Sequence, residues 1–199
     1  MPRIVDHDER RTELAEAVWR VIVRDGVQAT SIRTVAREAG RSAGSLRHYF
    51  ATHDKLLVFA MGLVEDRVRE RVSRIDINGL PVDVALRYCV EVLPLDDQRR
   101  AEAEVWFALS ASGLSAPRLG EIRDRADQGM YELCHGLLEG MRQSGAYRHQ
   151  RVDEVEVERL WSLLDGLSLH LLFAPRGVPV VDPEAVLRRY FDEVLVIPG

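Results

Sequence analysis

The chain has 199 residues and a mass of 22.6 kDa, the size of one to one and a half average domains. With 46% hydrophobic residues, 30% charged residues, 14 Gly and 8 Pro, its composition excludes long disorder, collagen and low-complexity sequence. No apolar run approaches the roughly 18–20 residues that cross a bilayer, and the N-terminus has no signal-peptide core. We therefore expect a cytoplasmic protein that does not bind a membrane.

The cysteine content and the distribution of charge further restrict which cofactors and binding partners the protein can have. Two cysteines are too few for a disulfide framework or a Cys-rich zinc site, so we expect no metal and no cofactor. Residues 1–55 carry 10 Lys and Arg against 8 Asp and Glu, whereas residues 56–199 carry 17 against 24. An N-terminal segment that is basic relative to the rest favours an anionic partner.

Helical periodicity dominates the chain, and no run alternates with period two. The first helix has Asp6 or Asp8 as its cap and ends at Gly26, and the second begins at Thr30 or Ser31. The first four helices are expected over 8–25, 30–39, 42–50 and 52–75. Five more are expected over 81–93, 94–112, 115–144, 153–173 and 182–195. The sequence thus predicts an all-α chain of about nine helices, with a three-helix head at 1–51 and a larger helical body at 52–199.

The stretch 30–57 carries the most informative motif. A tight turn at Gly40 separates two short helices, of which the first buries Ile32, Val35 and Ala36 and the second buries Leu46 and Phe50. This is helix-turn-helix spacing, in which the second helix enters the DNA major groove and the first braces it. Small residues at 42–45 begin the second helix, where larger side chains would keep the backbone away from the DNA.

This stretch resembles the DNA-binding head of the TetR family of one-component repressors. The matching positions are Ser31, Ile32, Val35, Ala36, Ala39, Gly40, Ser42, Gly44, Ser45, Leu46, Tyr49, Phe50, Thr52 and Leu56. The run at 48–50 is similar to the betaine-regulator branch of that family. The resemblance covers about residues 10–57 and implies a double-stranded DNA operator, a small-molecule effector and a homodimer.

Two departures from the family pattern fall at predicted contacts with DNA. Arg47 stands where the family has an aromatic residue, and His53 stands where it has a lysine. A solvated side chain or an intrahelical pair is the alternative for the arginines, and packing is the alternative for Tyr49 and His48. The predicted DNA contacts are Ser31, Arg33, Arg41, Ser42, Ala43, Gly44, Ser45, Arg47, His48, Tyr49, His53 and Lys55.

The body offers aromatic and sulfur side chains at helical spacing, which suit a pocket between helices although core packing explains each one alone. Tyr88, Trp106 and Tyr131 are predicted to form a partial cage for a cationic ligand. The predicted effector contacts are Tyr88, Trp106, Met130, Tyr131, Cys134 and Leu164.

The eighth helix is apolar on most sides, and such a helix must be buried on most sides. With the ninth helix it is predicted to form a four-helix bundle with a second copy of the chain. The predicted interface residues are Leu160, Trp161, Leu164, Leu167, Ser168, Leu171, Leu187, Tyr190 and Phe191.

No nucleophile with a base, phosphate-binding loop or metal-ligand set emerges from the spacing, so we do not expect an enzyme. The sequence predicts a DNA-binding transcriptional regulator, a repressor released from a pseudo-palindromic operator by a small molecule. The alternative is a DNA-binding regulator whose body binds a protein or only dimerises.

Overall fold

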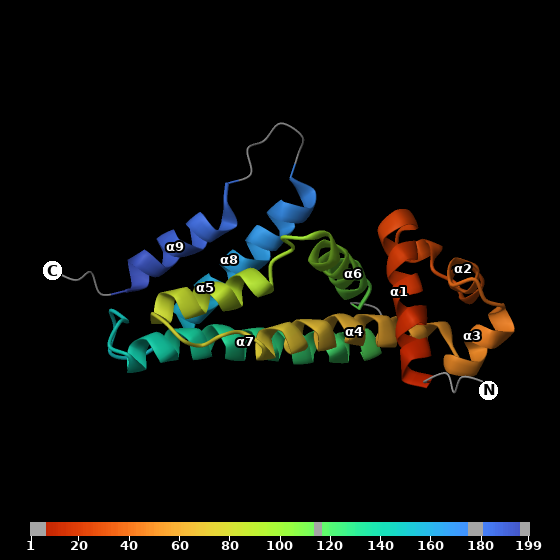
Figure 1. Ribbon diagram of the computed structural model, residues 1–199, viewed down its shortest axis with the longest axis horizontal. Helices are drawn as coiled ribbons and strands as arrows, with labels where there is room; N and C mark the ends of the chain where they lie inside the picture. Colours follow the sequence, from red (N-terminus) through yellow and green to blue (C-terminus); the bar gives the residue numbers. More distant parts are fainter. Residues whose placement is uncertain (1–6, 114–116, 175–180, 196–199) are drawn as a thin grey trace. The chain divides into compact units, whose positions relative to one another are not determined.

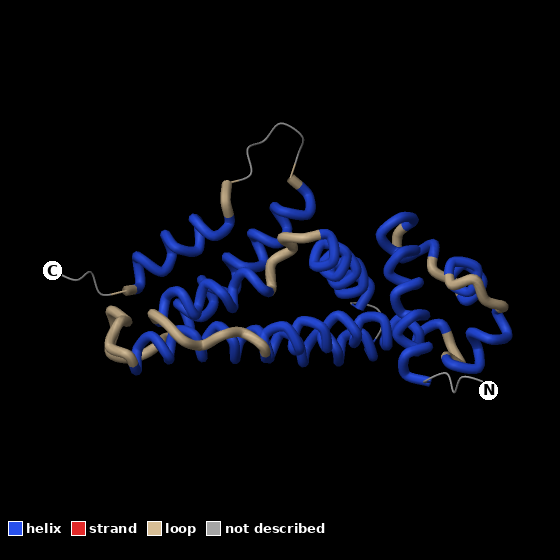
Figure 2. Tube along the Cα trace, in the orientation of Figure 1, coloured by secondary structure: helices blue, strands red, loops and turns tan. Residues whose placement is uncertain are grey.

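The computed structural model describes residues 7–113, 117–174 and 181–195, and helices and loops make up these ranges (Figures 1 and 2). The helices are α1 (His7–Asp25), α2 (Ile32–Glu38), α3 (Ala43–Tyr49), α4 (His53–Ser73), α5 (Pro81–Glu91), α6 (Asp97–Gly113), α7 (Pro117–Gln143), α8 (Glu154–Phe173) and α9 (Pro183–Val194). The all-α fold with nine helices is confirmed for the described residues. A short 3₁₀ turn at Val27–Ala29 and an isolated antiparallel bridge between Tyr147 and Leu195 were not expected.

Side-chain caps fix where several helices begin, as the sequence predicts. Each cap accepts a hydrogen bond from the backbone N–H three residues further on: Ser31 at 3.0 Å, Ser42 at 3.1 Å, Thr52 at 3.2 Å and Asp153 at 3.0 Å. Such a bond satisfies one of the N–H groups that a helix start leaves without an intrahelical partner. Of the two candidate caps for α1, Asp6 lies outside the described residues.

The described chain divides into two compact units. The first contains Met1–Arg67 and Ala101–Asp124, and therefore α1 to α3, most of α4 and α6, and the start of α7. Within this unit, the indole Nε1 of Trp19 donates to the backbone oxygen of Ala60 at 2.9 Å. Large side chains that are buried here include Leu14, Leu46, Phe50, Leu56, Met61 and Leu109. Trp19 and Phe50 are core residues, and the burial of Phe50 agrees with the sequence prediction.

The second unit contains Val68–Arg100 and Arg125–Gly199. Its core joins α5, α7, α8 and α9 through Leu86, Cys89, Leu93, Cys134, Leu138, Met141, Leu160, Leu164, Leu187 and Phe191. The guanidinium of Arg100 donates to the backbone oxygens of Leu171 and Leu172, both at 2.8 Å. These bonds satisfy carbonyl groups at the end of α8 that have no intrahelical partner.

The division into units does not fall at the expected boundary between residues 51 and 52. Compactness and biochemical role need not divide a chain at the same place, so the domain boundary stays a prediction. None of the helices within the described ranges has both the length and the apolar character that a membrane span requires.

Candidate DNA interface

The helix-turn-helix is built from α2, α3 and the turn between them. Gly40 has a φ of 62°, a left-handed conformation that glycine adopts without the steric cost of a Cβ. The turn is closed by a 2.8 Å bond from the backbone N–H of Arg41 to the oxygen of Ala36. Leu46 and Phe50 are buried on the inner side. Ile32, predicted to be buried, is only half-buried at the first position of α2, whereas Val35 and Ala36 one turn later are buried.

The outer side of this motif collects the predicted contacts. The exposed members of the set are Ser31, Arg33, Arg41, Ser42, Gly44, Ser45, Arg47, His48 and Lys55. Ala43, Tyr49 and His53 are half-buried. At Gly44 an added Cβ would meet only the Ser42 hydroxyl at 3.8 Å, so packing within the chain does not require glycine there.

Cations on and near the helix-turn-helix differ in whether a carboxylate pairs with them. Glu38 accepts from Arg20 Nε at 3.0 Å and from Arg24 Nη1 at 2.8 Å. Hydrogen bonds from Arg24 and Arg20 hold the pKa of Glu38 below its usual value. A second group, namely Arg33, Arg41, Arg47 and Lys55, makes no ion pair within the described part of the chain. This positive charge lies on α2, on the turn before α3, on α3 and in the first turn of α4.

His53 is less available than the sequence suggests. Its Nε2 lies 3.1 Å from the hydroxyl of Thr30, which itself donates to the backbone oxygen of Val27 at 2.6 Å. Because the Thr30 proton is used in that bond, His53 Nε2–H must be the donor to Thr30. Only Nδ1 remains for DNA, and a contact from His53 to phosphate stays a prediction.

The predicted effector residues do not all lie in one unit. Trp106 belongs to the first unit, and the other five belong to the second. Cys134 and Leu164 are buried in the core, whereas Tyr88, Met130 and Tyr131 are half-buried. The three-ring cage therefore stays a prediction.

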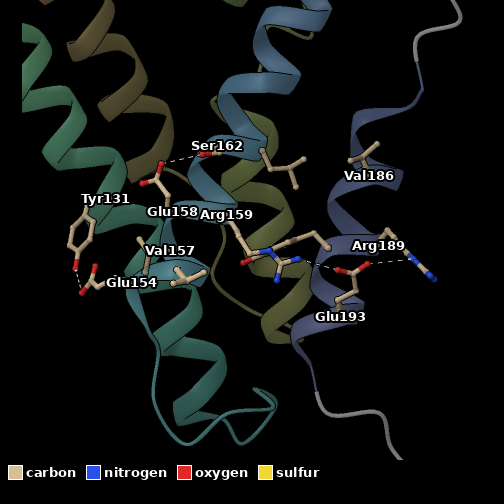
Figure 3. A pocket seen from close by; sticks show the side chains of 12 residues that line it. Tyr131, Glu154, Val157, Glu158, Arg159, Ser162, Val186, Arg189 and Glu193 are labelled. Atoms are coloured by element: carbon tan, nitrogen blue, oxygen red, sulfur yellow. Dashed lines mark hydrogen bonds and ion pairs between the residues drawn. The ribbon is translucent and has the colours of Figure 1, made fainter.

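An open groove of about 870 Å³, not foreseen from the sequence, lies among α7, α8 and α9 (Figure 3). Tyr131 lines it and donates to Glu154 at 3.1 Å, while Arg159 bridges to Glu193 at 3.2 Å. The other lining residues are Val155, Val157, Glu158, Ser162, Leu163, Val186, Arg189 and Tyr190. Tyr131 alone among the predicted effector residues reaches this groove.

The predicted dimer residues mostly serve the core of a single chain. Six are buried within it: Leu160, Leu164, Ser168, Leu187, Tyr190 and Phe191. Trp161, Leu167 and Leu171 are half-buried. Exposed apolar side chains lie elsewhere on α8, at Val155, Leu169 and Phe173. The apolar pattern marked α8 as a helix that is covered on most sides, but it did not distinguish its inner face from its outer face.

No group of three or more His, Cys, Asp or Glu within the described ranges is arranged to hold a metal ion.

Comparisons with known proteins agree with this geometry. The family model described as bacterial regulatory proteins, tetR family, matches residues 14–58, and the model for the C-terminal domain of BetI-type transcriptional repressors matches residues 81–196. The HTH-type transcriptional regulator PksA of Bacillus subtilis is 36% identical over 197 residues, covering 98% of this chain and 95% of that protein. A BetI regulator of Stenotrophomonas maltophilia is 32% identical over 139 residues, covering 68% of this chain and 70% of that protein.

Solved structures share the fold. A transcriptional regulator from Rhodococcus is similar with a TM-score of 0.80 at 27% identity, covering 94% of this chain and 99% of that one. A regulator from Saccharomonospora viridis, solved in complex with choline, has a TM-score of 0.82 at 24% identity and covers 96% of this chain and 100% of that one. The chain therefore belongs to the TetR family of transcriptional regulators, with a C-terminal domain of the BetI type.

Proposed function

We propose that this chain is a cytoplasmic, non-enzymatic repressor that binds a pseudo-palindromic operator as a homodimer and leaves it when a small molecule binds the second unit. The observation that carries the proposal is the set of cations without ion pairs, Arg33, Arg41, Arg47 and Lys55, around α3. Their neighbours Arg20 and Arg24 pair with Glu38, and Arg24 also pairs with Asp25. A DNA duplex supplies the missing anions.

The shape of α3 supports insertion into the major groove. Its first turn presents Ala43, Gly44 and Ser45, which allow the backbone to approach base edges and phosphates closely. Arg47 follows on the second turn, is exposed, and has the planar fork that pairs with a guanine in two hydrogen bonds. Gly44 has no packing role within the chain, which favours a role in that approach.

The outer face of α8 supports the dimer. Six positions recur there at alternating spacings of four and three residues: Val155, Arg159, Ser162, Gly166, Leu169 and Phe173. All but the half-buried Gly166 are exposed, and an added Cβ at Gly166 would meet nothing within 4 Å. A stripe with this spacing is typical of helices that pack along their length, and small central residues allow close approach. Three of the six also line the groove, so we assign the groove to the partner subunit.

We propose that the effector binds beside α5 and α7, with Tyr131 at the edge of the groove. Tyr88, Met130 and Tyr131 are half-buried there, and the first and last offer aromatic faces that attract cations. Quaternary ammonium compounds are therefore the first class to test. The alternative, a body that binds a protein, has no comparable observation in its favour.

The test starts from selection of duplexes from a random library by the purified protein. We expect enrichment of a pseudo-palindrome, bound by two subunits with an affinity that falls steeply with salt. An effector that lowers operator affinity tenfold must itself bind about tenfold more weakly when operator is present, because coupling is reciprocal. A protein that enriches no sequence would contradict the repressor assignment, and equal ligand affinity with and without operator would contradict release by that ligand.

A further inference from the structure

We propose that Arg11, on α1 and outside the helix-turn-helix, binds a DNA phosphate beside the C-terminal end of the recognition helix α3. This inference rests on the proposed DNA binding and extends the interface to a third helix. Arg11 belongs to neither the predicted contacts nor the ion-paired arginines described above.

Two aromatic rings hold the Arg11 side chain in place. The guanidinium carbon lies 4.4 Å from the ring centroid of Phe59 on α4 and 5.4 Å from that of Phe50. The two rings lie 5.4 Å apart, and Phe50 directly follows the last residue of α3. The guanidinium is therefore fixed next to the end of the recognition helix, and little side-chain entropy remains to be lost on binding an anion.

The Arg11 side chain is half-buried. The Nε atom is buried and has no hydrogen-bond partner. The two Nη atoms are not among the buried atoms that lack a partner. Arg11 makes no hydrogen bond or ion pair to another described residue, so both Nη groups remain available to an anion. An anion that approaches from outside meets two parallel N–H donors, the arrangement that suits phosphate.

Arg67 shows what a purely structural stacked arginine looks like in the same unit. Its guanidinium carbon lies 4.7 Å from the Trp19 ring centroid, a geometry much like that of Arg11. Arg67, however, pairs with Glu16 and lies 3.7 Å from Glu102, so carboxylates compensate its charge. Arg11 has the same aromatic support and no carboxylate partner among the described residues. This difference leaves its charge open to an external anion.

The position relative to α3 identifies that counter-charge. When a recognition helix lies in the major groove, the sugar–phosphate strands run along both walls of the groove, past both ends of the helix. Arg33, Arg41 and Arg47 lie on α2, α3 and the turn between them, and Arg11 reaches the opposite end of α3 from the turn. The competing explanation is structural, because a cation near a helix C-terminus also stabilises the helix dipole.

Salt dependence separates the two explanations. Operator affinity is measured by fluorescence anisotropy from 50 to about 300 mM salt for wild type, Arg11→Met, Arg11→Lys and the matched control Arg67→Met. Loss of one phosphate contact per subunit lowers the slope of log Kobs against log salt by about 0.9 per subunit, or about 1.8 per dimer. We expect this decrease for Arg11→Met, which keeps an apolar side chain on the rings. We expect a retained slope for Arg11→Lys and for Arg67→Met.

The outcomes are distinct. A wild-type slope for Arg11→Met would overturn the inference, whatever happened to its stability, because a structural arginine contributes no counterion release. If circular dichroism shows that Arg11→Met does not fold, Arg11→Gln is measured instead. The slope of log Kobs against log salt for that variant is then compared with the wild-type slope. If wild-type protein binds no operator, the proposed function fails rather than the role of Arg11.

Discussion

Thr30 and His53 are joined by a 3.1 Å hydrogen bond from His53 Nε2 to the Thr30 hydroxyl, which donates in turn to the Val27 carbonyl at 2.6 Å. Thr30 directly precedes the cap of α2, and His53 is the first residue of α4. The two residues are 23 positions apart in sequence and lie on either side of α3. Their bond therefore fixes the spacing between the helix that braces α3 and the helix that follows it.

Replacing Thr30 with Val tests that bond. Thr30 is only 7% exposed, so the change leaves His53 Nε2–H without its acceptor in a largely buried place. We expect a loss of about 1 kcal/mol in the free energy of unfolding, measured by urea denaturation. Thr34→Val is the control, because its hydroxyl bonds to Ser31 on the exposed surface, and we expect a change below about 0.5 kcal/mol. Equal losses of unfolding free energy for both variants would show that the Thr30 hydroxyl contributes no more to stability than the Thr34 hydroxyl.

Replacing Arg47 with Ala is expected to weaken operator binding and to relax base preference at one position per half-site. The guanidinium is exposed on α3 and lacks an ion-pair partner within the described residues, and a bidentate contact to guanine is worth about 1–3 kcal/mol. Binding to a set of operators with single-base changes measures both effects. Arg20→Ala removes an exposed arginine that is already paired with Glu38 and should leave binding unchanged. A uniform loss across all operators would instead make Arg47 a phosphate contact.

Replacing Gly44 with Ala should separate folding from DNA binding. Alanine is favoured over glycine inside a helix by roughly 0.5–1 kcal/mol, and an added Cβ at Gly44 meets only ordinary contact with Ser42. We therefore expect a more stable protein with weaker operator binding, by about 1–3 kcal/mol if the backbone closely approaches the DNA. Gly129→Ala, in open space on α7, should raise stability and leave binding intact. Undiminished operator affinity for Gly44→Ala would argue against close approach at this position.

Replacing Leu169 with Glu should turn a dimer into a folded monomer. Leu169 is 40% exposed and lies one turn from Phe173, which is 64% exposed, on the outer stripe of α8. A charge placed in an apolar interface is costly to desolvate, whereas on a monomer it remains in water. Sedimentation at micromolar concentration measures the mass, and Val23→Glu, at an equally exposed position on α1, is the control. A wild-type monomer, or a dimeric Leu169→Glu variant, would contradict the proposed surface.

Both cysteines are expected to be inert in the folded protein. Cys89 and Cys134 are fully buried in the second unit, and burial raises the pKa of the Cys134 thiol to about 12 and that of Cys89 well above its usual value. The reactive thiolate is therefore absent at neutral pH. A disulfide reagent such as dithionitrobenzoate should label both only after denaturation, whereas a Val23→Cys variant should react at once. Rapid labelling of native wild type would show that this core opens readily.

Local rules predicted the head well. Ser31, Ser42 and Thr52 cap their helices, and Gly40 takes the left-handed conformation at the turn, because these features depend on residues within a few positions of one another. The pairing of Glu38 with Arg20 and Arg24 was not predicted, since it joins α1 to α2 across 14 to 18 positions. Because this pairing cannot be seen in the sequence, the sequence alone does not distinguish arginines that pair with carboxylates from arginines that are available to bind DNA.

The body was harder to predict because periodicity identifies an apolar face without naming what covers it. Leu160, Leu164 and Phe191 were predicted to face a partner subunit, and the structure buries them in the core of one chain. The groove arises where α7, α8 and α9 meet, and no single stretch of sequence contains that meeting. Trp106 was grouped with Tyr131 on side-chain type alone.

On α3 the side chains that face outward are different from those that hold the helix in place. Leu46 and Phe50 secure it from within, while Arg47 and His48 are exposed. Substitutions at these two outward positions therefore change little of the free energy of folding. Over evolutionary time a duplicated copy of this chain can acquire a new operator sequence through such substitutions while its scaffold remains intact, and the same freedom is open to laboratory selection.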